Sequence, residues 1–241
     1  MRAITFDFWN TLYRYEDSDR EQRAAMLREV LRRAGYDRPP ERLLAANDAA
    51  WQAWAIIWAQ EHRTEDARFW LEHFLHAAEA TLPPALFEEA VERLEAVVMA
   101  PYVRPMEGAV ALVKGLARHH ALGLISDTAL TPGHLIRARL ERDGLLTCFR
   151  QLSFSDEVGR SKPHPRIFRV TLEALGATAA EAVHVGDIRR TDIAGAHGVG
   201  MRAIRFAGVF DDRDARWPEG DAVAFSYAEL ADILRGWGFR V

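Results

Sequence analysis

The chain contains little cysteine and no long apolar run. Its 241 residues include one cysteine, Cys148, so no disulfide can form within the chain. We expect this residue to behave as a small, half-buried apolar side chain. Lys, Arg or Gly interrupts each apolar stretch well short of the roughly 20 residues that a membrane-spanning helix needs. The first residues have the pattern of a β-strand, not of a signal peptide. These absences predict a cytoplasmic protein without a membrane partner.

A strong charge of either sign is also absent. The formal net charge is −4 and the isoelectric point is about 6.2, whereas nucleic-acid-binding domains carry basic clusters. Hydrophobic residues at 49% and charged residues at 27% are ordinary for a globular protein. We therefore expect a monomer or homodimer that acts on a small molecule, and we exclude nucleic acid as a partner.

The apolar pattern divides the chain into two regions. Residues 3–7 are largely apolar, as in a central strand of a parallel sheet that is covered on both faces. No further strand pattern occurs before about residue 121. The sequence between predicts helices, two of which begin at Pro-Pro pairs that suit a first helical turn. These predicted helices are 19–34, 40–59, 64–80 and 84–98.

Helices and strands alternate after residue 106. The predicted helices are 108–119, 132–143, 165–175 and 193–197, and the predicted strands are 121–126, 151–154, 182–186 and 201–206. Such alternation with short connections is typical of a parallel sheet flanked by helices. The sequence therefore predicts an α/β fold, a Rossmann-like core of residues 1–15 and 101–241. Residues 16–100 are predicted to form an α-helical cap inserted after the first strand.

Polar side chains follow three of the predicted strands. Asp7, Ser126 and Asp187 stand at carboxyl ends, where parallel sheets bind ligands, and Lys162 lies in a loop that can reach the same edge. Converging carboxylates repel each other unless a cation lies between them, and Mg²⁺ is the hard cation that such a site favours. Asp7 could then act as a carboxylate nucleophile, while Lys162 and Ser126 hold a phosphoryl group.

Two further aspartates lie near these strand ends, and the first of them allows two interpretations. Asp192 is either a third carboxylate of the metal site or the N-cap of the predicted helix that starts at Ile193. Asp127 follows Ser126 and has the pattern of an ordinary loop residue.

The predicted cap carries an aromatic stripe. Trp51, Trp54 and Trp58 share one helical face, which favours packing between cap helices. The alternative is that part of the stripe lines a substrate pocket. A charged run at 61–63 follows directly. We expect its side chains to be exposed to solvent, and the alternative is that they contact the substrate.

Four segments together resemble the motifs of the haloacid dehalogenase (HAD) superfamily of hydrolases, and the resemblance covers the whole chain. Asp7–Thr11 is similar to the first motif, D-x-D-x-T, which opens with an Asp nucleophile. Ser126 resembles the second motif and Lys162 the third. Asp187 and Asp192, within Gly-Asp-x4-Asp, resemble the fourth.

The resemblance implies an enzyme with an α-helical cap between its first two motifs and an aspartyl-phosphate on Asp7. It implies that Asp7 and Lys162 are catalytic and that phosphate is contacted by Ser126, Lys162, Asn10 and Thr11. It implies Mg²⁺ as cofactor, with the ligands Asp7, Asp187, Asp192 and the backbone carbonyl of Trp9.

Position 9 departs from the motif. In phosphatases of the superfamily an Asp at this position protonates the leaving alcohol and then activates the hydrolytic water. Trp9 can do neither, because its indole N–H donates but does not titrate. General acid–base catalysis is typically worth ~10²–10⁴ in rate. We therefore expect Mg²⁺-dependent hydrolysis of a small phosphorylated metabolite with weakened turnover. The first step should be weakened least for aryl or acyl phosphates, whose leaving groups depart without a proton. His164, Glu61 and His62 are the candidate replacements.

Two alternatives stay open. Dehalogenases of the superfamily also have an aromatic residue at position 9, and their halide leaves without a proton. Their fourth motif, however, resembles Ser-x-Asn and needs no metal, whereas this chain has Gly186-Asp187. The other alternative is a regulatory protein that keeps the metal and phosphate site and has little turnover.

Overall fold

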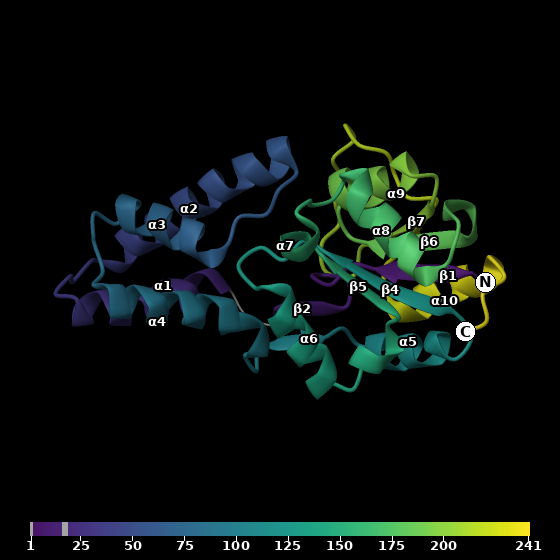
Figure 1. Cartoon of the computed structure of the whole chain (residues 1–241), viewed down its shortest axis with the longest axis horizontal. Coiled ribbons are helices and arrows are strands. Elements are labelled where there is room, and N and C mark those ends of the chain that lie inside the picture. Colours follow the sequence, from purple (N-terminus) through teal and green to yellow (C-terminus); the bar gives the residue numbers. More distant parts are fainter. Residues whose placement is uncertain (1, 16–18) are drawn as a thin grey trace.

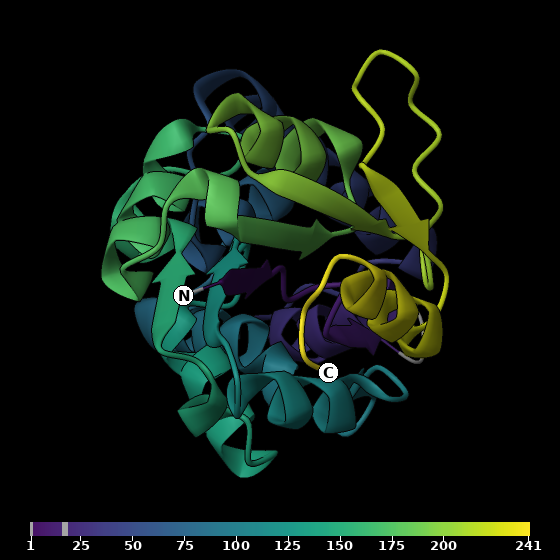
Figure 2. The same ribbon diagram turned by 90° about the vertical axis from the view of Figure 1, so that its right-hand side faces the viewer.

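A six-stranded parallel sheet forms the centre of the molecule (Figures 1 and 2). The computed structural model describes residues 2–15 and 19–241. The strand order is β5-β4-β1-β6-β7-β8, and all neighbouring strands run parallel. The strands are β1 (Ala3–Phe6), β4 (Ala121–Ser126), β5 (Gln151–Phe154), β6 (Ala182–Gly186), β7 (Arg202–Phe206) and β8 (Ala222–Ala224). The predicted α/β fold with a central parallel sheet is confirmed.

Helices cover both faces of this sheet, which explains why its strands are apolar throughout. Figure 2 shows α8 (Pro165–Leu175) and α9 (Ala194–Gly198) on one face, and α5 (Ala109–Ala117) and α10 (Tyr227–Gly236) on the other. Side chains of a strand alternate between faces. Ile4 and Phe6 of β1 accordingly join the core beneath α5 and α10, whereas Ala3 packs with α8 and α9.

The insertion after β1 is helical, as predicted. Its helices are α1 (Asp19–Arg33), α2 (Pro40–Glu61), α3 (Ala67–Ala77) and α4 (Pro84–Glu95). They lie beside the sheet (Figure 1) and bury an apolar cluster of their own. Helix α3 begins at Ala67, not at Thr64, because Asp66 caps it by accepting a hydrogen bond from the Phe69 amide at 2.9 Å.

Two short strands that the sequence did not predict join the helical insertion to the sheet. They are β2 (Tyr13–Tyr15) and β3 (Val103–Pro105), which pair antiparallel where the chain leaves the core and returns to it. The predicted start of the cap at residue 16 lies outside the described residues. We propose that the domain boundary coincides with this strand pair.

Several smaller elements complete the chain. The sequence analysis did not predict β8, α10 or the short α7 (Ser155–Val158), whereas the helix predicted at 132–143 is observed as α6 (Gly133–Arg142). The remaining elements are 3-10 helices and one π-helical turn: Ala96–Met99, Leu146–Cys148, Ala179–Glu181 and Arg189–Ile193. Cys148 is a free, half-buried thiol. Within the described residues, no helix is both long and apolar enough to cross a membrane.

One buried arginine holds the segment that returns from the cap. Arg139 of α6 is 2% exposed. Its guanidinium contacts Asp143 at 2.6 Å and also donates to three backbone carbonyls, those of Val98, Ala100 and Val103. Guanidinium is suited to this task because its donors form a rigid planar fork.

Replacing Arg139 with Met should lower the free energy of unfolding by about 3–5 kcal/mol, because the half-buried Asp143 carboxylate and the three carbonyls lose their donor. Arg142→Met is the matched control. The Arg142 side chain is 49% exposed beside Asp143, so its loss should cost about 0–1 kcal/mol. Urea unfolding of both variants provides the measurement, and equal losses would contradict the assignment.

Candidate active site

Two neighbouring strands deliver two carboxylates to one edge of the sheet. Asp7 directly follows β1, and Asp187 directly follows β6, which pairs with β1. Asn10 lies in the turn after Asp7 in a left-handed conformation, with φ of 56°, which asparagine tolerates better than most residues. Its side-chain amide donates to Asp187 Oδ2 at 3.3 Å. The first and fourth motifs are therefore joined directly.

A third carboxylate approaches from the turn after β6. One oxygen each of Asp7, Asp187 and Asp192 lies within 4.8 Å of the other two, and all three residues are buried. Gly186 makes this approach possible, because a side chain at Gly186 would overlap the Asp192 carboxylate. The glycine of the fourth motif thus has a steric role.

Burial and mutual repulsion act on two of these carboxyl groups. Burial raises the pKa of Asp7 to about 7, although the Lys162 charge partly opposes the rise. Burial, reinforced by the charges of Asp7 and Asp192, raises the pKa of Asp187 well above its ordinary value. Both groups therefore need additional positive charge to stay ionised together at neutral pH.

Lys162 supplies part of that charge. Its ammonium donates to Asp7 Oδ1 and, at 2.6 Å, to Asp192 Oδ1. Burial disfavours the charge on Lys162, but the nearby carboxylates of Asp192 and Asp7 outweigh this effect and raise its pKa. Burial likewise opposes the charge on Asp192, yet Lys162 and hydrogen bonding by His184 lower the pKa of Asp192. The pair Lys162 and Asp192 is therefore charged.

Asp192 is anchored from behind by His184, a residue of β6 that the sequence reasoning missed. His184 Nε2 lies 3.0 Å from Asp192 Oδ1, and its Nδ1 lies 2.8 Å from the Thr5 hydroxyl. Burial lowers the pKa of His184, so the ring is neutral and links Thr5 to Asp192. A polar residue inside an otherwise apolar strand was the available signal.

The N-cap alternative for Asp192 is not observed. Helix α9 has no side-chain cap, and Asp192 lies inside the π-helical turn that precedes it. Asp192 Oδ2 instead accepts a hydrogen bond at 3.0 Å from the amide of Ile188, a residue just after the end of β6.

The donor set fits a hard divalent cation. Three buried carboxylates converge, and the raised pKa values of Asp7 and Asp187 mark a deficit of positive charge. Oxygen ligands from one or two carboxylates, completed by water, are what Mg²⁺ prefers. The residues that would hold the ion are Asp7, Asp187 and Asp192.

A cavity of about 150 Å³ opens onto these groups. Core residues line one side of it, and Trp54 and Trp58 of α2 line the other. Trp54 is also buried within the cap and lies 5.4 Å from the ring of Trp51. The aromatic stripe therefore packs the cap, and two of its residues also line the cavity beside the carboxylates; the binding of substrate there stays a prediction.

Asp127 joins the cap to the core, a role that the sequence did not indicate. Its Oδ2 accepts from the Trp58 indole N–H at 2.7 Å, and its Oδ1 accepts from the Lys162 backbone amide at 2.9 Å. Burial raises the pKa of Asp127. Arg190 lies over the Trp58 ring at 4.0 Å. Trp58 is thus held between an acidic and a basic residue of the core.

The cap also touches the loop that carries Lys162. The Ser161 amide donates to the His62 carbonyl at 2.8 Å, and the Ser161 hydroxyl lies 2.8 Å from that of Thr64. The 61–63 run therefore meets the core through its backbone, while the Glu61 and Arg63 side chains pair at the surface.

Three further predicted residues, Ser126, Thr11 and His164, are not among those that line the cavity. Ser126 ends β4 and is buried, with its hydroxyl 3.3 Å from the Asp127 carbonyl. Thr11 is buried, and its carbonyl accepts from Tyr227 at 2.8 Å. His164 caps α8 by accepting from the Arg166 amide. Trp9 does line the cavity.

Replacing His184 with Gln should change how stability depends on pH. The unfolded chain protonates this histidine below its ordinary pKa of 6.5, whereas the folded chain resists protonation. Wild-type stability should therefore fall as pH drops below 6.5, by up to about 1.4 kcal/mol per pH unit from this residue. Urea unfolding between pH 7 and pH 5 should give a shallower decline for His184→Gln. Equal slopes would mean that His184 is charged in the fold.

Comparison with known proteins places the chain in a family. A family model described as a haloacid dehalogenase-like hydrolase matches residues 1–200. Among curated relatives, a glyceraldehyde 3-phosphate phosphatase of Pyrococcus furiosus is 33% identical over 141 residues, which are 55% of this chain and 55% of that protein. The chain spans about half the length of the curated relatives that it matches.

Solved structures agree over nearly the whole length. A HAD phosphatase from Thermococcus onnurineus is 26% identical, with a TM-score of 0.65 and complete coverage of both chains. A 2-haloacid dehalogenase from Pseudomonas syringae is also 26% identical, with a TM-score of 0.66 and coverage of 98% of this chain and 99% of that one. With its motifs meeting at one sheet edge and the family model matching 200 residues, the chain belongs to the haloacid dehalogenase-like hydrolases.

Proposed function

We propose that this hydrolase is a Mg²⁺-dependent phosphatase that acts on a small phosphorylated compound through an aspartyl-phosphate on Asp7. The observation that carries the proposal is the contact of Lys162 with Asp7 and Asp192, next to Asp187, at the floor of a small cavity. A nucleophilic carboxylate, a fixed cation and a metal-binding set are the parts that phosphoryl transfer requires.

In the first step, a carboxylate oxygen of Asp7 attacks phosphorus. The bond between phosphorus and the leaving oxygen breaks, and its electron pair departs with the leaving group. Lys162 favours the ionised form of Asp7 and offsets the negative charge of the phosphoryl oxygens, while Asp192 and His184 hold Lys162 in place. Bound Mg²⁺, held by Asp7, Asp187, Asp192 and the Trp9 carbonyl, would supply the remaining positive charge.

In the second step, water attacks phosphorus, releases phosphate and restores the Asp7 carboxylate. An acid–base group beside the cavity would assist this step, but Trp9 cannot take a proton. We therefore expect the aspartyl-phosphate to form faster than it hydrolyses. The cap contributes Trp54 and Trp58 to the cavity lining, and these apolar side chains reduce the water around the reacting groups.

The carboxylate cluster favours phosphoryl transfer over dehalogenation. A metal-independent dehalogenase would have no use for Asp187 near the nucleophile, since burial and the charge of Asp7 raise the pKa of Asp187 and make its ionised form costly. Trp9 favours the dehalogenase alternative, and a 2-haloacid dehalogenase is as similar to the chain, at 26% identity, as a HAD phosphatase is. The regulatory alternative predicts Mg²⁺ or phosphate binding without turnover.

Rapid mixing with p-nitrophenyl phosphate and Mg²⁺ should release a burst of nitrophenolate near one equivalent per chain, followed by slow turnover. Asp7→Asn should abolish the burst, because an amide is not a nucleophile, and EDTA should abolish it by removing the metal. Asp232→Asn, on a side chain that is 74% exposed, is the matched control and should behave as wild type. Turnover that persists in Asp7→Asn or in EDTA would sink the proposal.

Replacing Trp9 with Asp should restore the missing acid–base group. Hydrolysis of an alkyl phosphate such as ethyl phosphate should then rise by ~10²–10⁴-fold, and the slow phase after the burst should shorten. The burst rate with p-nitrophenyl phosphate should change little, because nitrophenolate leaves without a proton. Trp9→Phe keeps a ring without an acid and should not accelerate hydrolysis. A similar gain in both variants would point to relief of crowding in place of acid catalysis.

A further inference from the structure

We propose that the leaving group of the substrate is a single uncharged aromatic ring, held in a second cavity next to Trp9. The inference rests on the proposed phosphatase function and narrows its substrate class to aryl phosphates. It combines the chemistry that Trp9 imposes on the leaving group with the size, lining and charge of the cavity that adjoins it.

The second cavity measures about 170 Å³ and adjoins the reaction cavity. Trp9 and Ala129 line both cavities, so these two residues lie between the carboxylates around Asp7 and the second cavity, and the proposal places the ring beyond Trp9. The residue at position 9 is also the one that neighbours the leaving oxygen in the proposed reaction. The second cavity therefore lies on the leaving-group side.

Aromatic rings form much of its wall. Trp9, Tyr15 and Trp51 line it together with aliphatic Val97 and Leu130. The rings of Trp9 and Tyr15 stack with centroids 4.9 Å apart and planes only 5° from parallel. Such a fixed pair offers a flat surface on which another ring can stack or pack edge to face. Cavities of about 150 Å³ with apolar walls are known to hold benzene, so one ring fits.

The charge of the lining does not call for a charged ring. Among the residues that line this cavity, Arg23 is the charged one. Its guanidinium stands over Trp51 and Trp70 at 5.3 and 5.4 Å and donates to Asn47 at 3.0 Å. The arginine is therefore already stabilised by the cap, and no charge on the ring is needed to balance it.

The chemistry of Trp9 favours the same leaving group. Without an acid, the leaving oxygen must depart as an anion, and phenols ionise near pH 10 whereas water and simple alcohols need about pH 16. Asp7 forms its bond to phosphorus as the bond to the aryl oxygen breaks, and the phenolate carries the electron pair away. It then takes a proton from water, so no acidic side chain is required.

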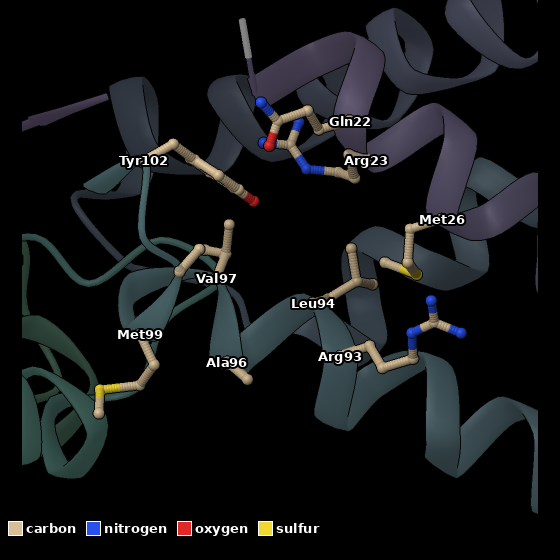
Figure 3. Close-up of a pocket in the computed structure, with 10 residues that line it drawn as sticks. Gln22, Arg23, Met26, Arg93, Leu94, Ala96, Val97, Met99 and Tyr102 are labelled. Atoms are coloured by element: carbon tan, nitrogen blue, oxygen red, sulfur yellow. The ribbon is translucent and has the colours of Figure 1, made fainter. Parts of the chain in front are cut away.

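A third cavity gives ring substituents a place to extend. It measures about 340 Å³ and shares Arg23 and Val97 with the aromatic cavity. Figure 3 shows Arg23 on α1 and Val97 on the 3-10 helix facing each other across it, with Tyr102 on the rim. Substituents that point away from the phosphate would enter this space, so the ring need not be bare phenol.

The test compares three phosphates in the full-length chain with Mg²⁺. Acetyl phosphate has a good leaving group and no ring, phenyl phosphate has the ring, and ethyl phosphate has neither. Val97→Phe and Leu130→Phe each fill the aromatic cavity from a different element, and Val209→Phe, at a site 42% exposed, is the matched control. The readouts are circular dichroism, Asp7 phosphorylation by acetyl phosphate, and kcat/KM for each compound.

We expect the ratio of kcat/KM for phenyl phosphate to that for acetyl phosphate to fall about tenfold or more in the filled variants and to stay unchanged in Val209→Phe. An unchanged ratio in either folded, filled variant would overturn the ring site. It would leave the phosphatase proposal standing, provided that acetyl phosphate still phosphorylates Asp7. Failure of all three compounds to phosphorylate the wild-type chain would overturn both.

Discussion

The contact of one buried ammonium with two carboxylates is the constraint on which the site depends. Lys162 comes from the loop between β5 and α8, Asp7 from β1, and Asp192 from the turn after β6. Three segments far apart in the sequence are thereby fixed to one another at the sheet edge. Without such partners, burying the Lys162 charge would cost several kcal/mol, which is about the effective penalty for removing one ion from water. The fold is therefore stable at this edge only in the arrangement that also brings the proposed nucleophile Asp7, the Lys162 ammonium and the Asp192 carboxylate together.

The same point is linked to the cap through Asp127, which accepts from both the Lys162 amide and the Trp58 indole. One Asp127 oxygen therefore binds the Lys162 loop, and the other oxygen binds helix α2. Ser161 adds a second link, because its amide meets the cap at His62. Closure of the cap and placement of Lys162 are consequently not independent events, and the cavity acquires its aromatic wall in the state in which Lys162 is held.

Sequence reasoning located the centre of this site because strand ends are visible in a sequence. Asp7 and Asp187 each follow a short apolar run, and parallel strands bring such ends to one edge. It could not locate Asp127, because a carboxylate after Ser126 has the pattern of a loop residue and its partner, Trp58, is 69 positions away. The role of His184 could not be predicted for a related reason. It depends on the pairing of β6 with β1, which places Thr5 opposite His184. The strands β2 and β3 are three residues each, too short to give a period.

Lys162 and Lys114 are the two lysines of the chain, in which the other basic side chains are arginine or histidine. Lys114 lies exposed on α5, on the face of the sheet opposite α8, whereas Lys162 is 2% exposed and its raised pKa keeps it protonated. Acylating reagents need an accessible, deprotonated amine. Among the side chains of the folded protein they will therefore find Lys114, so that an amine-directed dye or surface linker can be attached to this lysine with the Lys162 ammonium left intact.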